Sequence, residues 1–446
     1  MVGLGLAAVI ALAPVLEAEA QSSRPRLIRD AEIESTLRAY ADPIFAAAGL
    51  DTSAVQVHII QDKRINAFVS GGMQIFVHTG LLTQAKTPNE LIGVIAHETG
   101  HIQGGHLARR KEELENRTIE AIVGILAGIA VGVASGNAGV GVGAATLGQS
   151  IATADLLQYS QAQEGAADQA AFRLLDATEQ SPKGMVDFFR MLVRQEALSA
   201  INQDPYLRTH PLTTSRVDST EAALRQSRYA DRADPPELMM RHERMLAKLN
   251  GYLEPLGRVM QMYPEKDRSV PARYARAIAL YRVSRMDEAV AIMDSLLSES
   301  PDDPFFLEQK AQILYENRQV REALPLYQRA LDLAPSEPLI RMELATAQVE
   351  SKDPSLLQSA VTNLNEVVRL EPKNAGAFYE LGQAYYDLGD EPMASLCQAE
   401  AALARGKNKE AKQFADRALQ GLKEGSPGWL RAQDIQFAAD QGDEDE

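Results

Sequence analysis

The second half of the sequence repeats itself with a period of 34 residues. From Ser269 onward, each unit places alanine, two apolar or small residues and then proline at matching positions. These positions are Ala289, Met293, Leu296 and Pro301, then Ala323, Tyr327, Ala330 and Pro335, then, after a slightly longer loop, Ala360, Leu364, Val367 and Pro372. A further unit opens with Leu381, Gly382, Tyr385 and Ala394. Because one unit of this size cannot bury its own apolar face, this part of the chain is restricted to a stack of helix pairs.

This period, with small residues where two helices cross and proline at the unit boundary, is the tetratricopeptide signature. Stacked units of this kind form a superhelix whose concave groove suits peptides or partner proteins. We assign the array to residues 269–440, although the sequence departs from the repeat pattern after Glu400 while remaining helical in character. Residues 236–268 are expected to form one or two connecting helices, and residues 441–446 an acidic tail.

Ahead of the repeats, an apolar helix that begins with a cap at Thr87 carries His97, Glu98 and His101 within the stretch LIGVIAHETGHIQGGH, residues 91–106. Two histidines at positions i and i+4 lie on one face of a helix, where both rings can bind one zinc ion. Glu98 can then activate a water molecule. The alternative is a pair of satisfied core histidines. It is disfavoured because each unpaired polar group in a buried helix costs about 1 to 3 kcal/mol.

A second helix, predicted over residues 154–178, supplies a candidate third ligand. Glu164 lies on a stripe of otherwise apolar residues, and Asp168 follows one turn later. A carboxylate on an apolar stripe needs a cation, and two histidines with one glutamate leave a zinc position open for hydrolysis. Asp168 can orient a ligand histidine through the ring nitrogen that faces away from the metal. The alternative is a surface acid pair at a helix bend.

His106 is the competing third ligand. On a continuous helix, its position after His97 places it about 180° around the axis, so that it faces away from the metal. A break of the helix at Gly104 and Gly105 could bring it back. We prefer Glu164 and keep His106 as the alternative.

A polar loop closes the region that holds these motifs, at residues 208–216, RTHPLTTSR. Within it, His210 could occupy the open metal position or donate a hydrogen bond to a developing oxyanion. Arg216 is a second candidate for the same site. From spacing alone, His210 could equally be a loop histidine without a role.

The segment before the candidate zinc helix predicts a small α+β unit. Residues 22–48 show helical spacing, residues 55–60 alternate as a strand, and residues 66–82 form two short strands that end in a turn at Gly80. A strand next to a zinc helix can hold an extended peptide by strand addition. The predicted fold class is therefore mostly α, with a zincin-type α+β metallopeptidase domain and a small sheet over residues 21–235, followed by an all-α tetratricopeptide solenoid.

Two apolar segments bear on location. Residues 1–20 end in the small-x-small pattern Ala18, Glu19, Ala20, which is typical of a signal peptide, although no basic residue precedes the apolar run. We expect export, into the periplasm if the source is a Gram-negative bacterium; the alternative is a cytosolic protein with an apolar terminus. Residues 121–148 are apolar but interrupted by glycine, so a buried hairpin, a mobile lid and a peripheral membrane contact all remain open.

Charge and cysteine content narrow the class of partner. The formal charge of −16 argues against nucleic acid, because the chain offers no basic stripe to phosphates. The single cysteine, Cys397, excludes a disulfide within the chain and any cysteine-rich metal site. Neither property conflicts with export.

Four motifs in order along the chain resemble the HtpX-like, CAAX-prenyl-protease-like family of HExxH zinc peptidases: NAFVSGG, HETGH, EGAAD and HPLTTSR. With its tetratricopeptide tail, the chain is similar to periplasmic members of that family. The resemblance implies one zinc ion per chain, held by His97, His101 and Glu164, with Glu98 as the general base.

The resemblance also implies a form of regulation and a class of substrate. His210 is expected to cap the zinc and keep the enzyme latent, and Arg216 to support the site. The implied substrates are misassembled outer-membrane proteins, with the repeat groove contacting their assembly machinery. The leading hypothesis is therefore a periplasmic zinc metalloendopeptidase, and the alternative is a chaperone or assembly scaffold whose peptidase is largely latent.

Overall fold

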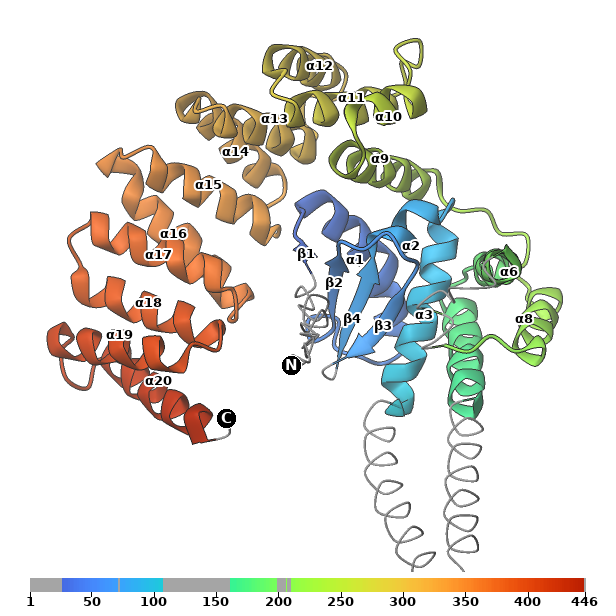
Figure 1. Cartoon of the computed structure of the whole chain (residues 1–446), viewed down its shortest axis with the longest axis horizontal. Coiled ribbons are helices and arrows are strands. Elements are labelled where there is room, and N and C mark those ends of the chain that lie inside the picture. Colours follow the sequence, from blue (N-terminus) through green and yellow to red (C-terminus); the bar gives the residue numbers. More distant parts are fainter. Residues whose placement is uncertain (1–25, 71–72, 107–160, 199–205, 207–209, 445–446) are drawn as a thin grey trace, which may run out of the picture.

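The chain is mostly helical and carries one small sheet. The computed structural model, drawn in Figure 1, describes residues 26–70, 73–106, 161–198, 206 and 210–444. The predicted signal peptide at residues 1–20 and the apolar segment at residues 121–148 lie outside these ranges. Among the described residues, no helix has both the length and the apolar character needed to cross a membrane.

The sheet consists of four strands: β1 (Leu27–Ile28), β2 (Gln56–Ile60), β3 (Ala67–Ser70) and β4 (Gln74–His78). Their order is β1-β2-β4-β3, in which β2 and β4 are parallel and each outer strand is antiparallel to its neighbour. One face of the sheet enters the core through Ile59, Ile75 and Val77. On the opposite face the rings of Phe68 and Phe76 stack with their centroids 5.2 Å apart. As the last strand in this order, β3 forms one edge of the sheet in the described part of the chain.

The first helix, α1 (Ala31–Ala47), starts later than the prediction of a helix over residues 22–48. Asp30 ends the preceding extended segment, because its side chain caps the helix by accepting a hydrogen bond from the backbone N–H of Ile33 at 2.9 Å. The residues before this cap pair with β2 as β1. Local spacing alone could not reveal that pairing, because it joins segments distant in sequence.

The turn predicted at Gly80 is instead part of a short helix, α2 (Thr79–Gln84), which follows β4 directly. A glycine is needed there because a Cβ atom would lie 2.2 Å from the carbonyl oxygen of Lys63. The prediction of a turn was wrong. In the sequence alone, a glycine that is required by close packing cannot be told apart from one that is required by a reversal of the chain.

α3 (Pro88–Gly104) runs through the centre of this domain. Thr87 caps its first turn by accepting a hydrogen bond from the backbone N–H of Glu90. α3 packs against α1, β3 and α6 (Lys183–Leu198), and α6 in turn contacts α8 (Thr214–Gln226). A helix over residues 161–177, the described part of the segment predicted at 154–178, lies beside α3 in Figure 1.

The second half of the chain is a succession of antiparallel helices. They are α9 (Pro236–Leu253), α10 (Leu256–Met262), α11 (Val270–Arg282), α12 (Met286–Glu299), α13 (Pro304–Glu316), α14 (Val320–Leu333), α15 (Pro338–Glu350), α16 (Pro354–Leu370), α17 (Ala375–Asp387), α18 (Glu391–Ala404), α19 (Asn408–Gly421) and α20 (Pro427–Glu444). The repeated alanines Ala289, Ala323 and Ala360 are fully buried. Small side chains therefore occupy the positions at which the helices cross, as the repeat predicts.

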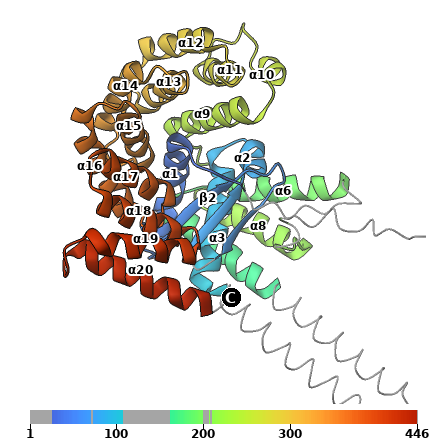
Figure 2. The same ribbon diagram turned by 60° about the vertical axis from the view of Figure 1, so that its left-hand side comes forward.

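The helix pairs form an arc around the N-terminal domain, on the side that carries α1 and β1 (Figures 1 and 2). Charged contacts join the two parts. Arg29, beside β1, lies 2.6 Å from Glu371 at the end of α16. The fully buried Lys248 of α9 lies 2.9 Å from Asp30 and 3.4 Å from Glu308 of α13. The predicted fold class, a mostly helical chain with a small α+β domain and a helical solenoid, is confirmed.

Candidate active site

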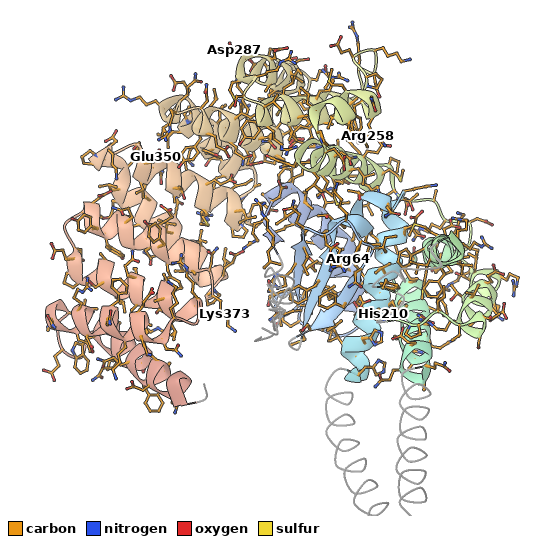
Figure 3. The ribbon with its side chains drawn as sticks, viewed as in Figure 1. Arg64, His210, Arg258, Asp287, Glu350 and Lys373 are labelled. Carbon is orange, nitrogen blue, oxygen red and sulfur yellow. The ribbon has the colours of Figure 1, made fainter. Side chains whose placement is uncertain are left out.

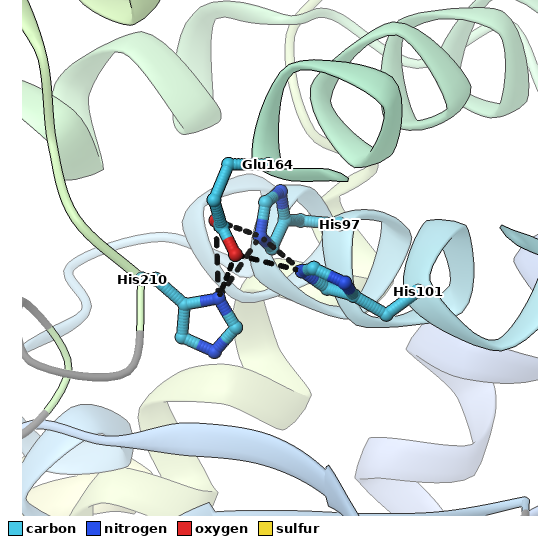
Figure 4. Close-up of side chains that lie close together, drawn as sticks. All are labelled: His97, His101, Glu164 and His210. Carbon is cyan, nitrogen blue, oxygen red and sulfur yellow. Dashed lines mark hydrogen bonds and ion pairs between the residues drawn. The ribbon is translucent and has the colours of Figure 1, made fainter. Parts of the chain in front are cut away.

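Four side chains converge beside α3, as Figure 4 shows: His97 and His101 of α3, Glu164 of the helix over residues 161–177, and His210 of the loop before α8. One possible ligand atom from each lies within 4.8 Å of the others. The Nε2 atoms of His97 and His101 are 3.1 Å apart. The carboxylate of Glu164 lies 3.3 Å from the first of these nitrogens and 3.4 Å from the second. Two imidazoles and a carboxylate are ligands that zinc accepts in hydrolytic sites.

Two glycines on α3 let the neighbouring helices come close enough to build this cluster. A Cβ atom on Gly100 would lie 2.8 Å from the carbonyl oxygen of Ala167, and one on Gly93 would lie 3.0 Å from Met185 of α6. The helix over residues 161–177 therefore rests almost on the backbone of α3. This close approach brings Glu164 to the face of α3 that carries the histidines.

Asp168 and Arg216 support the cluster from behind. Asp168 Oδ1 lies 2.9 Å from Nδ1 of His97, the ring nitrogen that faces away from the cluster. Arg216 donates two hydrogen bonds to Asp168, at 2.7 and 2.9 Å, and its Nη1 lies 3.0 Å from Glu164. Burial alone would raise the pKa of Asp168, but the hydrogen bonds from Arg216 and His97 hold it below its usual value. Asp168 therefore stays ionised and fixes the orientation of the His97 ring.

Glu98 is fully buried, and neither oxygen of its carboxylate has a hydrogen-bond partner among the residues that the structure describes. Burial raises the pKa of Glu98. A buried carboxylate without hydrogen bonds is costly, so such a group usually marks a place for water, an ion or a substrate. The donors of the cluster and this orphaned carboxylate together fit a hydrolytic zinc site.

His210 faces the other three members of the cluster. Its Nδ1 lies 3.2 Å from both oxygens of Glu164 and 3.4 Å from Nε2 of His97, while its Nε2 lies 3.5 Å from Glu98. Figure 3 shows His210 beside α3 and the helix over residues 161–177. The ring of His210 thus lies between the carboxylates of Glu164 and Glu98.

Tyr206 is a residue of this site that the sequence did not reveal. Its ring is buried and stacks on that of His210 with the centroids 4.7 Å apart. The backbone N–H of His210 donates a hydrogen bond to the carbonyl oxygen of Tyr206 at 2.7 Å. The spacing of four residues between Tyr206 and His210 is a weak signal, because it brings the two rings together only when the segment forms a helical turn.

His106, the competing third ligand, does not join the cluster. Its Nδ1 lies 2.9 Å from Nδ1 of His101, the nitrogen opposite to the one that faces Glu164. The ring is buried. Glu164 therefore lies in the candidate metal-binding cluster, whereas His106 lies behind His101 and contacts the far side of that ring.

A helix with the HExxH pattern, a glutamate from a second helix and an attached solenoid define the class: a metallopeptidase domain joined to tetratricopeptide repeats. Residues 28–224 match Peptidase family M48. Residues 309–356 match the tetratricopeptide repeat, and residues 357–389 match a further TPR repeat. The chain thus carries an M48 metallopeptidase domain followed by TPR repeats, which confirms the resemblance that the four motifs predict.

Two of the similar proteins match most of the chain, and a third matches part of it. The beta-barrel assembly-enhancing protease of Yersinia pestis is 25% identical over 405 residues, which cover 90% of this chain and 82% of that protein. The beta-barrel assembly-enhancing protease of Escherichia coli K12 is 25% identical over 378 residues, 82% of this chain and 75% of the relative. Metalloprotease LoiP of the same strain is 30% identical over 164 residues, 36% of this chain and 60% of that protein.

Proposed function

We propose that this protein is a periplasmic zinc metalloendopeptidase that hydrolyses misfolded or misassembled outer-membrane proteins. The observation that carries the proposal is the convergence of His97, His101 and Glu164 beside the orphaned carboxylate of Glu98. The names of its relatives, beta-barrel assembly-enhancing proteases, support the substrate class. The apolar pattern of residues 1–20 supports export.

In this proposal, His97, His101 and Glu164 hold one zinc ion. When bound, zinc supplies Lewis acidity toward a substrate carbonyl and lowers the pKa of water. Glu98 accepts a proton from the attacking water and delivers it to the leaving amine. Its complete burial serves this role, because a raised pKa makes the carboxylate a better proton acceptor than an exposed glutamate. Asp168 and Arg216 keep the ring of His97 in place.

β3 offers a means of holding the substrate. It is an edge strand of the sheet and contacts α3, the helix that carries Glu98. An extended peptide can add to such an edge through backbone hydrogen bonds, which require no particular side chains. A misassembled barrel protein exposes unpaired strands, so its chemistry matches this mode of binding.

The helical array is proposed to select what reaches the site. Its concave side faces the N-terminal domain, as Figures 1 and 2 show. A groove of this kind suits protein partners. We assign to it the binding of substrates or of the outer-membrane assembly machinery. Peripheral membrane contact through residues 121–148 remains a prediction, since those residues lie outside the described part of the chain.

A second candidate function is that of an assembly scaffold or chaperone whose peptidase is largely latent. The observation that favours it is the position of His210, whose Nδ1 lies within 3.4 Å of His97 and 3.2 Å of Glu164. A nitrogen there competes with water and substrate for the open zinc position. In this case the array would be the principal working surface.

The substitution Glu98→Gln separates the two functions. We expect the purified variant to keep its fold and one zinc ion per chain by elemental analysis, while peptide hydrolysis falls by about 100-fold or more. In cells, misassembled outer-membrane proteins should accumulate as they do without the protein. Glu410→Gln, on the exposed surface of α19, is the matched control and should behave as wild type. Full rescue of outer-membrane assembly by Glu98→Gln would make the scaffold the principal function.

A further inference from the structure

The two candidate zinc-binding histidines of α3 are held from behind in different ways. The outer nitrogen of His97, Nδ1, contacts the carboxylate of Asp168 at 2.9 Å. The outer nitrogen of His101, also Nδ1, lies 2.9 Å from Nδ1 of His106. The two rings of this second pair meet nearly at right angles, with an interplanar angle of 78° and centroids 5.0 Å apart. The short distance between the two Nδ1 atoms allows a ring N–H of one histidine to donate to the lone pair of the other.

The end of α3 is built so that His106 can reach this position. Gly105 adopts the left-handed conformation with φ of +59° and ends the helix one residue before His106. Gly104 leaves the space that the ring of His106 fills, because a Cβ atom there would lie 2.2 Å from Nε2 of His106. The pair of glycines therefore has a specific geometric effect: it folds His106 against the outer side of His101.

We propose that His106 is a positioning residue for the zinc ligand His101. In the arrangement that we infer, Nδ1–H of His101 donates a hydrogen bond to Nδ1 of His106, which carries its own proton on Nε2. This bond selects the tautomer of His101 whose Nε2 lone pair is free, and it aims that lone pair at the place where Glu164 and His97 converge. Glu164 and His106 thus have distinct roles, the first as ligand and the second as support.

The proposal rests on zinc binding at His97, His101 and Glu164, as put forward in the proposed function. It adds that this site uses two different supports, an anionic one behind His97 and a neutral one behind His101. A neutral acceptor orients the ring but increases its basicity less than a carboxylate does. Loss of His106 should therefore lower the affinity for zinc, because the ring of His101 would no longer be held in the orientation that binds the metal.

Zinc affinity of the full-length protein, measured by competition with a chromophoric chelator, tests the proposal through four variants. His106→Leu removes the acceptor, and we expect zinc to bind about 10- to 100-fold more weakly. His106→Gln retains an acceptor oxygen and should recover part of the loss. Gly104→Ala leaves His106 intact but places a methyl group where its ring lies, so it should also weaken binding. Gly257→Ala, at a helical glycine of α10 with open space around it, is the matched control and should bind zinc as wild type does.

Thermal unfolding of the zinc-free proteins distinguishes a positioning role from a purely structural one. A positioning role predicts melting temperatures close to wild type for His106→Gln and Gly104→Ala, together with weaker zinc binding. Unchanged zinc affinity in these variants would overturn the proposal, and so would a zinc-binding loss that merely follows a loss of zinc-free stability. If wild-type protein itself binds no zinc, the proposed function fails. If wild type binds zinc and the His106 variants bind it equally well, this inference alone fails.

Discussion

At the scale of single residues, the site depends on which buried charges have partners. Arg216 and Asp168 satisfy one another and hold His97, so this part of the site is rigid. Glu98 and Nε2 of His210, in contrast, are buried without hydrogen-bond partners in the described part of the chain, and they face one another at 3.5 Å. Unsatisfied groups tend to lie where a protein exchanges ligands, because water, metal or substrate can satisfy them in turn. Asp168 and Arg216 therefore support the cluster, whereas Glu98 and His210 are the groups available for chemistry.

His210 is predicted to act as a latch. Its replacement in His210→Ala removes a nitrogen that competes for the open metal position, so hydrolysis of an unstructured protein substrate should rise. The increase would be about tenfold if the open state makes up about one-tenth of the wild-type population. Initial rates of cleavage, with zinc content measured in the same preparation, provide the test. A loss of activity with zinc retained would instead make His210 a group that stabilises the transition state.

At the scale of elements, the position of β3 at the edge of the described sheet is the feature with the clearest functional consequence. The backbone N–H of His78 donates to the carbonyl oxygen of Asn66, so Asn66 and His78 are a hydrogen-bonded pair of the antiparallel ladder. Because such pairs alternate, Phe68 bonds to β4, whereas the N–H and C=O groups of Val69 point away from β4. Val69 thus presents its backbone to the edge at which a substrate strand could add.

Val69→Pro tests strand addition. Proline at this position removes one outward N–H while leaving the bonds to β4 in place, so the fold should persist. Loss of one backbone hydrogen bond to substrate should raise KM about 2- to 12-fold. Phe68→Pro is the contrasting variant, because it removes a bond of the sheet itself and should lower the melting temperature. Wild-type KM in a folded Val69→Pro variant would exclude β3 as the binding edge.

At the scale of the whole molecule, α9 links the two halves of the chain. Met245 and Leu249 belong to the core of the N-terminal domain, whereas Ala247 packs with α10 and α11. Between these two faces, Lys248 is buried among carboxylates from both halves. Burial alone would lower the pKa of Lys248, but the neighbouring carboxylates, Asp30 and Glu308 foremost, raise it well above its ordinary value. The array is therefore attached by a charged junction rather than by a flexible linker.

Lys248→Met is predicted to weaken this junction. It removes the cation from a buried group of acids, and loss of one partner of a buried ion pair costs about 3 to 5 kcal/mol. Urea unfolding followed by circular dichroism measures the change in the free energy of unfolding. Lys310→Met removes a more exposed ion pair with Asp294 on the array and should cost at most about 1 kcal/mol. Equal stability of the two variants would show that the buried network can be replaced by apolar packing.

The sequence by itself determined the features that depend on local spacing. A 34-residue period in the second half predicts stacked helices, and histidines at positions i and i+4 place two rings on one face of α3. The same helical geometry favours Glu164 over His106 as third ligand. The prediction of stacked helices succeeds because helical periodicity and helix caps involve residues only a few positions apart.

Only the tertiary structure decided how distant segments meet. It brought Glu164 and His210 to the rings of α3, placed Tyr206 on His210 and turned His106 behind His101. It also joined α9 to α1 and α13 through Lys248. The physical reason is that these contacts depend on close approaches between helices, such as the one that Gly100 permits. A glycine in the sequence does not reveal which backbone it will touch.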